Sequence, residues 1–126
     1  MGAGGFVLNE RNLNRLFVAL FWAAWLFALV MALLPHPPRV MGDTNDKVQH
    51  IIAFVTLSVL ASIAYPRAGL EKIGLLLSAY GAAIEVLQAI PVLNRDSSFW
   101  DWVADTAAVL VSLALVWAWR RTRRSG

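Results

Sequence analysis

The sequence lacks several features that mark familiar classes of enzyme. Its 126 residues include no cysteine, which excludes disulfides and thiolate metal sites. It contains neither a glycine-rich phosphate loop nor a nucleophile elbow. Charged residues make up only 15% of the chain, against about 25% in ordinary soluble domains. The longest hydrophilic stretch is about a dozen residues, so any chemistry has to take place between apolar segments.

Apolar residues are abundant instead, at 59% of the chain, where about 45–50% is usual. Four apolar segments approach the roughly 20 residues that a helix needs to cross a bilayer. Proline or glycine in each break argues against a continuous helix. We therefore expect one all-α membrane domain over residues 1–126, with a disordered basic tail at 120–126. The four predicted transmembrane helices cover residues 16–34, 48–65, 73–90 and 102–119.

The distribution of basic residues predicts the orientation. Eight of the eleven flank one side, in the N-terminal segment, the second break and the C-terminal tail. The other side carries only Arg39, Lys47 and Arg95. The positive-inside rule then places both termini in the cytoplasm, and we expect the protein in a bacterial inner or plasma membrane. The arginine-rich end is interpreted as a membrane flank rather than a nucleic-acid site. Tryptophans at both ends of the last segment are spaced for aromatic belts, at positions 100, 102, 117 and 119.

Polar residues inside the apolar segments fall at the predicted outer ends. Glu85 lies roughly 8 Å inside the end of its helix and Asp105 roughly 6 Å inside the start of its own. Glu85 shares a side with the small-residue stripe Gly74, Ser78 and Ala82, which favours close helix packing. Asp105 aligns with a second small-residue face, residues 108 and 112. We therefore expect ionisable groups from three helices to point into one pocket that is open to the outside.

Three segments also carry a resemblance. DKVQHIIAF, IEVLQ and RDSSFWDWVADT resemble the signature segments of the VanZ-like family, small membrane proteins named for a member linked to teicoplanin resistance. The resemblance covers residues 46–112 and implies a location for a site more than a reaction. Asp105 departs from the family's usual asparagine, and Ala108 and Ser112 from its usual glycines, so that the pocket gains a carboxylate. The polar set that the resemblance implies is Asp46, Lys47, His50, Glu85, Gln88, Arg95 and Asp101.

These residues divide into two groups of candidates. The proposed catalytic group, which handles protons, consists of His50, Glu85, Asp101 and Asp105. The proposed substrate-binding group consists of Asp46, Lys47, Gln88 and Arg95. Within them, Asp46 lies one turn before His50 and is placed to orient one ring nitrogen. Arg95, with Lys47, is suited to attract an anionic group.

Each candidate also has a structural interpretation. Glu85 and Gln88 can form interhelical hydrogen bonds or ion pairs, for example with Lys47 or Arg95, that fix packing only. His50 can be an ordinary interfacial side chain, and Ser98 or Asp101 can cap the last helix. His36 lies among prolines and is interpreted as a loop residue.

A metal site made by His50, Glu85 and Asp105 is a further alternative, because imidazole and carboxylate suit zinc or manganese. No HExxH or comparable spacing supports it, so the sequence predicts no metal and no cofactor.

The function predicted from the sequence is that of an integral membrane protein embedded in the lipid bilayer. It binds or acts on an envelope component, namely a lipid head group, a glycan precursor or a glycopeptide-related ligand, and has no nucleic-acid partner. Whether it is an enzyme stays open at this point. One alternative is a non-catalytic interaction protein whose polar residues lock the bundle. A transporter is disfavoured, because the inner halves of the helices carry little polarity beyond Ser58, Ser62 and Ser112.

Overall fold

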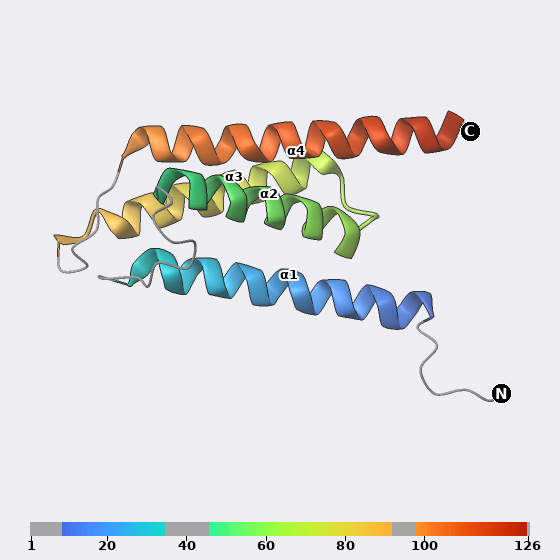
Figure 1. Cartoon of the computed structure of the whole chain (residues 1–126), viewed down its shortest axis with the longest axis horizontal. Helices are drawn as coiled ribbons and strands as arrows, with labels where there is room; N and C mark the ends of the chain where they lie inside the picture. The colour runs from blue at the N-terminus through green and yellow to red at the C-terminus, as the bar shows by residue number, and fades with distance from the viewer. Residues whose placement is uncertain (1–8, 35–45, 92–97, 126) are drawn as a thin grey trace.

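The computed structural model describes residues 9–34, 46–91 and 98–125, without the side chains of residues 46–47 and 124–125. Within this part the chain is entirely helical, as predicted (Figure 1). The four helices are α1 (Glu10–Leu33), α2 (Asp46–Ala64), α3 (Leu70–Gln88) and α4 (Phe99–Ser125).

Two helix starts depend on polar caps that a search for apolar segments does not detect. α1 begins before its apolar run because the side chain of Asn9 accepts a hydrogen bond from the backbone N–H of Asn12 at 2.8 Å. Ser98 directly precedes α4, and its Oγ accepts the backbone N–H of Trp100 at 3.2 Å. The prediction that Ser98 caps the last helix is confirmed.

The prediction of a disordered tail at 120–126 is wrong up to Ser125, because α4 continues through the arginines. Arginine is a good helix former. The guanidinium groups of Arg121 and Arg123 lie over the rings of Trp117 and Trp119, at 4.9 and 5.0 Å, each one helical turn back. Arg120 also bonds to α2, so this end of α4 is held by packing as well as by propensity.

The helices alternate in direction, and α2 contacts each of the other three (Figure 1). One end of the bundle therefore gathers the last turn of α1, the first of α2, the last of α3 and the first of α4. We call this the polar end, because those candidate residues that the structure describes lie there. The opposite end holds the start of α1, the end of α2, the start of α3 and the end of α4.

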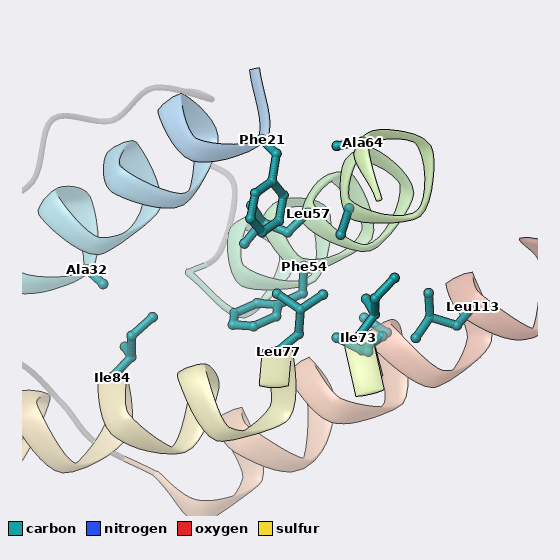
Figure 2. Packing of buried hydrophobic residues seen from close by; sticks show 12 residues of the cluster. Phe21, Ala32, Phe54, Leu57, Ala64, Ile73, Leu77, Ile84 and Leu113 are labelled. Atoms are coloured by element: carbon teal, nitrogen blue, oxygen red, sulfur yellow. The ribbon is translucent and has the colours of Figure 1, made fainter. Parts of the chain in front are cut away.

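Apolar side chains form both the core and much of the exterior. Phe54, Leu57 and Val109 lie at the centre, and part of this core is shown in Figure 2. Leu75 and Val86 on α3 are 71% and 70% exposed, although they are strongly apolar. Two helical stretches, residues 10–33 and 99–123, are long and apolar enough to cross a membrane. The chain thus has an all-α fold with apolar helices whose outer faces suit lipid.

Close contact between α3 and α4 depends on small residues of the predicted stripe. A Cβ on Gly74 would lie 3.2 Å from Leu113 Cδ1 of α4. At Gly81, which lies outside the predicted stripe, a Cβ would lie 3.3 Å from the ring of Phe54 on α2. Between them, the hydroxyl groups of Ser78 and Thr106 are hydrogen-bonded at 2.9 Å. The stripe therefore lets α3 lie directly against α4, as expected from small residues at a helix interface.

Candidate functional site

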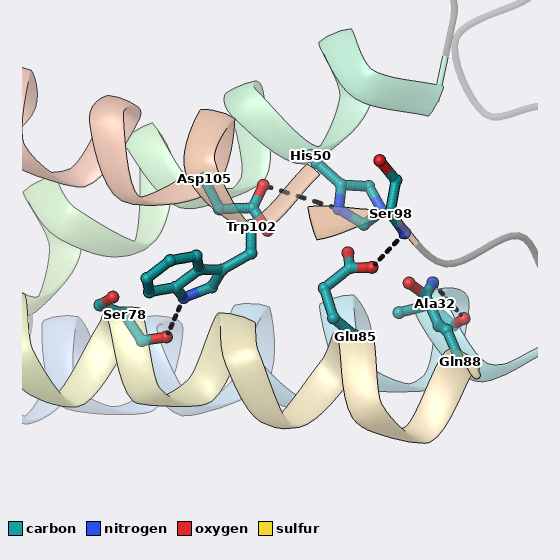
Figure 3. A network of polar contacts seen from close by, with 8 residues as sticks. All are labelled: Ala32, His50, Ser78, Glu85, Gln88, Ser98, Trp102 and Asp105. Atoms are coloured by element: carbon teal, nitrogen blue, oxygen red, sulfur yellow. Dashed lines mark hydrogen bonds and ion pairs between the residues drawn. The ribbon is translucent and has the colours of Figure 1, made fainter. Parts of the chain in front are cut away.

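Three helices bring His50, Glu85 and Asp105 together at the polar end (Figure 3). His50 comes from the second turn of α2, Glu85 from the last turn of α3 and Asp105 from the second turn of α4. One nitrogen or oxygen atom from each lies within 4.8 Å of the other two. We call these three residues the polar cluster. The convergence expected from the helix faces is present, while the catalytic role of these residues stays a prediction.

The pair formed by His50 and Asp105 is close but not hydrogen-bonded. Nδ1 of His50 lies 3.6 Å from Oδ1 of Asp105, which is beyond the usual hydrogen-bond range. The side chain of Asp105 is fully buried, whereas 16% of the His50 side chain is exposed. Among the described residues, neither Oδ1 nor Oδ2 of Asp105 has a hydrogen-bond partner. A buried carboxylate in this condition is costly unless something compensates its charge.

Glu85 has a structural contact as well. Its Oε2 accepts the backbone N–H of Ser98 at 3.0 Å, and the side chain is 8% exposed. This bond joins the last turn of α3 to the N-cap of α4. One oxygen of Glu85 therefore has a packing role, as in the structural interpretation. The donor is a backbone N–H rather than a basic side chain.

Gln88 is also partly engaged in packing. Its Nε2 donates to the carbonyl oxygen of Ala32 at 2.9 Å, in the last turn of α1, where such carbonyls have no helical partner. The side chain is 1% exposed, and Oε1 has no hydrogen-bond partner in the described part of the chain. The substrate-binding role of Gln88 stays a prediction, and Oε1 is an acceptor that the described bonds do not use.

Of the remaining candidate residues, the structure describes the side chain of Asp101 but not those of Asp46, Lys47 and Arg95. Asp101 is half-buried one turn before Asp105, and its carboxylate, like those of Glu85 and Asp105, is close enough to His50 for an electrostatic interaction. The side chains of Asp46 and Lys47 and the whole of Arg95 lie outside the described residues. Their predicted roles stay predictions, and the partner that the structure gives to Nδ1 of His50 is Asp105.

Hydrogen bonds that two aromatic side chains make between helices were not identified from the sequence. Trp102 is half-buried, and its Nε1 donates to the carbonyl of Ser78 at 3.0 Å, so it joins α4 to α3, while its place in an aromatic belt stays a prediction. The hydroxyl group of Tyr80 donates to the backbone carbonyl of Trp25 at 2.6 Å, and the two rings are stacked with their centroids 4.8 Å apart. The signal that identifies such residues is an aromatic N–H or O–H inside an apolar segment, which needs an acceptor once buried.

Polar side chains at the opposite end bond to backbone carbonyls, as Gln88 does at the polar end. Asn14 donates to the carbonyl of Ala64 and Arg120 to the carbonyl of Ser62, both at 2.8 Å. These bonds satisfy carbonyls in the last turn of α2, which have no partner within the helix. Halfway along α2, the buried hydroxyl of Ser58 bonds to the carbonyl of Phe54 in its own helix.

Chemically, the polar cluster offers an imidazole and two carboxylates in apolar surroundings. Such a group can exchange protons with a ligand, accept hydrogen bonds from it, or coordinate a cation. No family model, no curated protein and no solved structure matches this chain. The resemblance to the VanZ-like family therefore stays a hypothesis that depends on the three quoted segments.

Proposed function

We propose that this chain is a four-span membrane protein with cytoplasmic termini, whose polar cluster binds an envelope component at the extracytoplasmic boundary. Apolar side chains that face outward on all four helices support the four spans. Examples are Leu26 on α1, Ile52 on α2, Leu75 on α3 and Leu115 on α4, which are 55%, 43%, 71% and 66% exposed. The excess of basic residues at the opposite end supports the orientation.

One observation carries the functional part of the proposal: Asp105 is fully buried beside His50 and Glu85, yet neither of its oxygens accepts a hydrogen bond from a described residue. Residues kept only for packing are expected to use their hydrogen-bonding capacity within the bundle. A carboxylate held in this way destabilises the fold, so its presence favours a role toward a ligand.

The proposed ligand is an amphiphile with an anionic head group, such as a phospholipid or a lipid-linked glycan precursor. Its apolar chains would lie along the exposed leucines and valines, and Arg95 with Lys47 would attract the anionic group. The VanZ-like resemblance adds a glycopeptide-related ligand and an effect on teicoplanin susceptibility as further candidates. An enzymatic step on the bound ligand would use His50 and Glu85 as proton-transfer groups.

The test is ligand binding by the full chain in lipid nanodiscs, with phosphatidylglycerol, a polyisoprenyl phosphate and teicoplanin as probes. We expect saturable binding of at least one probe, and an affinity about tenfold or more lower in Glu85→Gln and His50→Gln, since each loses a polar contact of more than about 1.4 kcal/mol. Glu71→Gln, at the opposite end of α3, is the matched control and should bind normally. Absence of binding to all three probes would contradict the proposal.

A second candidate is the structural one, which two observations favour. Glu85 bonds to the backbone of Ser98 and Gln88 to the backbone of Ala32, and both bonds join helices. If locking the bundle is their only role, Glu85→Ala and Gln88→Ala should lower the yield of folded protein together. If Glu85 also serves a ligand, Glu85→Ala should lose binding in protein that is still folded.

A further inference from the structure

The polar cluster has the composition and spacing of an incomplete metal coordination shell. His50 offers a ring nitrogen, and Glu85 and Asp105 each offer a carboxylate oxygen, all three atoms within 4.8 Å of one another. Nitrogen and oxygen ligands of a tetrahedral zinc ion lie about 3.4 Å apart, at about 2.1 Å from the metal. Side-chain rotations that move each group by less than about 1 Å close this difference.

Asp105 supplies an independent indication of a cation. Its side chain has no exposed surface, and it points toward His50 and Glu85 from the second turn of α4 (Figure 3). Both of its oxygens are without a hydrogen-bond partner among the described residues. A cation between the three side chains would satisfy these oxygens, which no described donor does.

The charges agree with a divalent ion. Two carboxylates and a neutral imidazole carry a charge of −2, and Asp101 adds further negative potential at His50. A protonated His50 that pairs with Asp105 would compensate only one of these charges.

We propose that His50, Glu85 and Asp105 bind a divalent transition-metal ion, zinc or manganese. Imidazole and carboxylate ligands are shared by sites for both metals. Three protein ligands leave coordination positions for water or an anionic oxygen, as in catalytic zinc sites. The step from metal binding to coordination of a phosphate head group rests on the function proposed above, whereas metal binding itself does not.

The experiment measures metal in the purified full-length protein. The protein is stripped with EDTA, incubated with zinc sulfate or manganese chloride, desalted and analysed by inductively coupled plasma mass spectrometry. We expect one ion per chain, and an affinity lower by more than about 100-fold in His50→Ala and Asp105→Asn, since even outer-shell substitutions cost about 10–100-fold. His36→Ala is the matched control, because it removes the only other histidine, and it should bind like the wild type.

Each outcome decides the proposal. Cobalt(II) absorption bands that depend on His50, in variants that remain monodisperse, would support coordination by its imidazole. If Asp105→Asn fails to fold, His50→Gln takes its place. Wild-type protein that retains no zinc or manganese above the buffer level overturns the inference, and so does equal metal loss in His36→Ala. Binding of polyisoprenyl phosphate by metal-free protein, at the wild-type affinity, would overturn only the coordination of the phosphate by the ion. Metal binding without any lipid or glycopeptide binding would overturn the proposed function alone.

Discussion

The two ends of this bundle differ in how completely their polar side chains are hydrogen-bonded. At the opposite end, Asn14 and Arg120 donate to the last carbonyls of α2, so polar side chains complete the hydrogen bonding of the backbone. At the polar end, His50 and Asp105 face each other at 3.6 Å, without a hydrogen bond, in a buried environment.

This difference separates polar residues that complete backbone hydrogen bonding from His50 and Asp105, for which we propose a ligand. A side chain at a helix end usually serves the backbone groups that the helix leaves unsatisfied. Asp105 does not, although it lies in the second turn of α4, and the surrounding fold pays a desolvation cost to hold it there. Substitutions at the two ends should therefore have opposite consequences for stability and for binding.

The largest effect is expected for a leucine at either close-contact glycine of α3. Gly74→Leu and Gly81→Leu both overpack the interface with other helices and should each destabilise the fold by about 1–3 kcal/mol. Only Gly81→Leu should also disturb the polar cluster, because its Cβ would lie 3.5 Å from Oδ2 of Asp105. Thermal unfolding measures the loss of stability. Metal retention, measured at a temperature well below the unfolding midpoint, reports the effect on the polar cluster. Equal retention in both variants would contradict the link between Gly81 and the cluster.

The next effect is a gain in stability at the polar end. Asp105→Asn removes a buried charge without changing the shape of the side chain, and should stabilise the metal-free protein by about 1–2 kcal/mol. The same variant should lose metal binding. Chemical denaturation in EDTA tests the gain. A less stable Asp105→Asn protein would show that the carboxylate is part of the structural lock.

A loss of stability without a loss of binding is expected at the opposite end. Arg120→Ala and Asn14→Ala each leave a carbonyl of α2 without its donor and should destabilise the fold by about 1 kcal/mol. Neither residue lies near the polar cluster, so metal and lipid binding should be unchanged. Denaturation measured beside binding tests both points, and impaired binding in either variant would remove the distinction between the two ends.

The smallest effect should come from the middle of the bundle. Ser78→Ala breaks the hydrogen bond with Thr106 but keeps the carbonyl that Trp102 uses. We expect a loss of about 0.6 kcal/mol, the average for such bonds between membrane helices. Thr106→Ala is the partner variant, and a double-mutant cycle measures their coupling. A coupling well above this value would mean that the α3–α4 contact depends on this bond more than on its glycines.

Sequence reasoning located the helices and the polar end because both follow from local patterns. Apolar runs interrupted by proline defined four helices, and chain direction alone placed the ends of α1 and α3 beside the starts of α2 and α4. It missed the extension of α4 to Ser125, where arginine propensity and the ring contacts of Trp117 and Trp119 outweigh polarity.

Side-chain pairing was harder to predict than helix position. Asp46 was the expected partner of a His50 nitrogen because it lies one turn away in sequence, while the partner observed at Nδ1 is Asp105 on another helix. Spacing rules gave the metal alternative no support, because the three groups come from three helices and share no short motif. Only the packing of α2, α3 and α4 brings them together.

The proposed function requires that the polar end faces the outside of the membrane. The absence of cysteine allows a clean test, in which a single cysteine is placed at Ile90, beside the polar end, or at Pro66, at the opposite end. Right-side-out vesicles are treated with a membrane-impermeant maleimide before and after permeabilisation. We predict labelling of Ile90→Cys in sealed vesicles, and labelling of Pro66→Cys only once they are opened. The reverse pattern would place the polar cluster on the cytoplasmic side and contradict the proposed function.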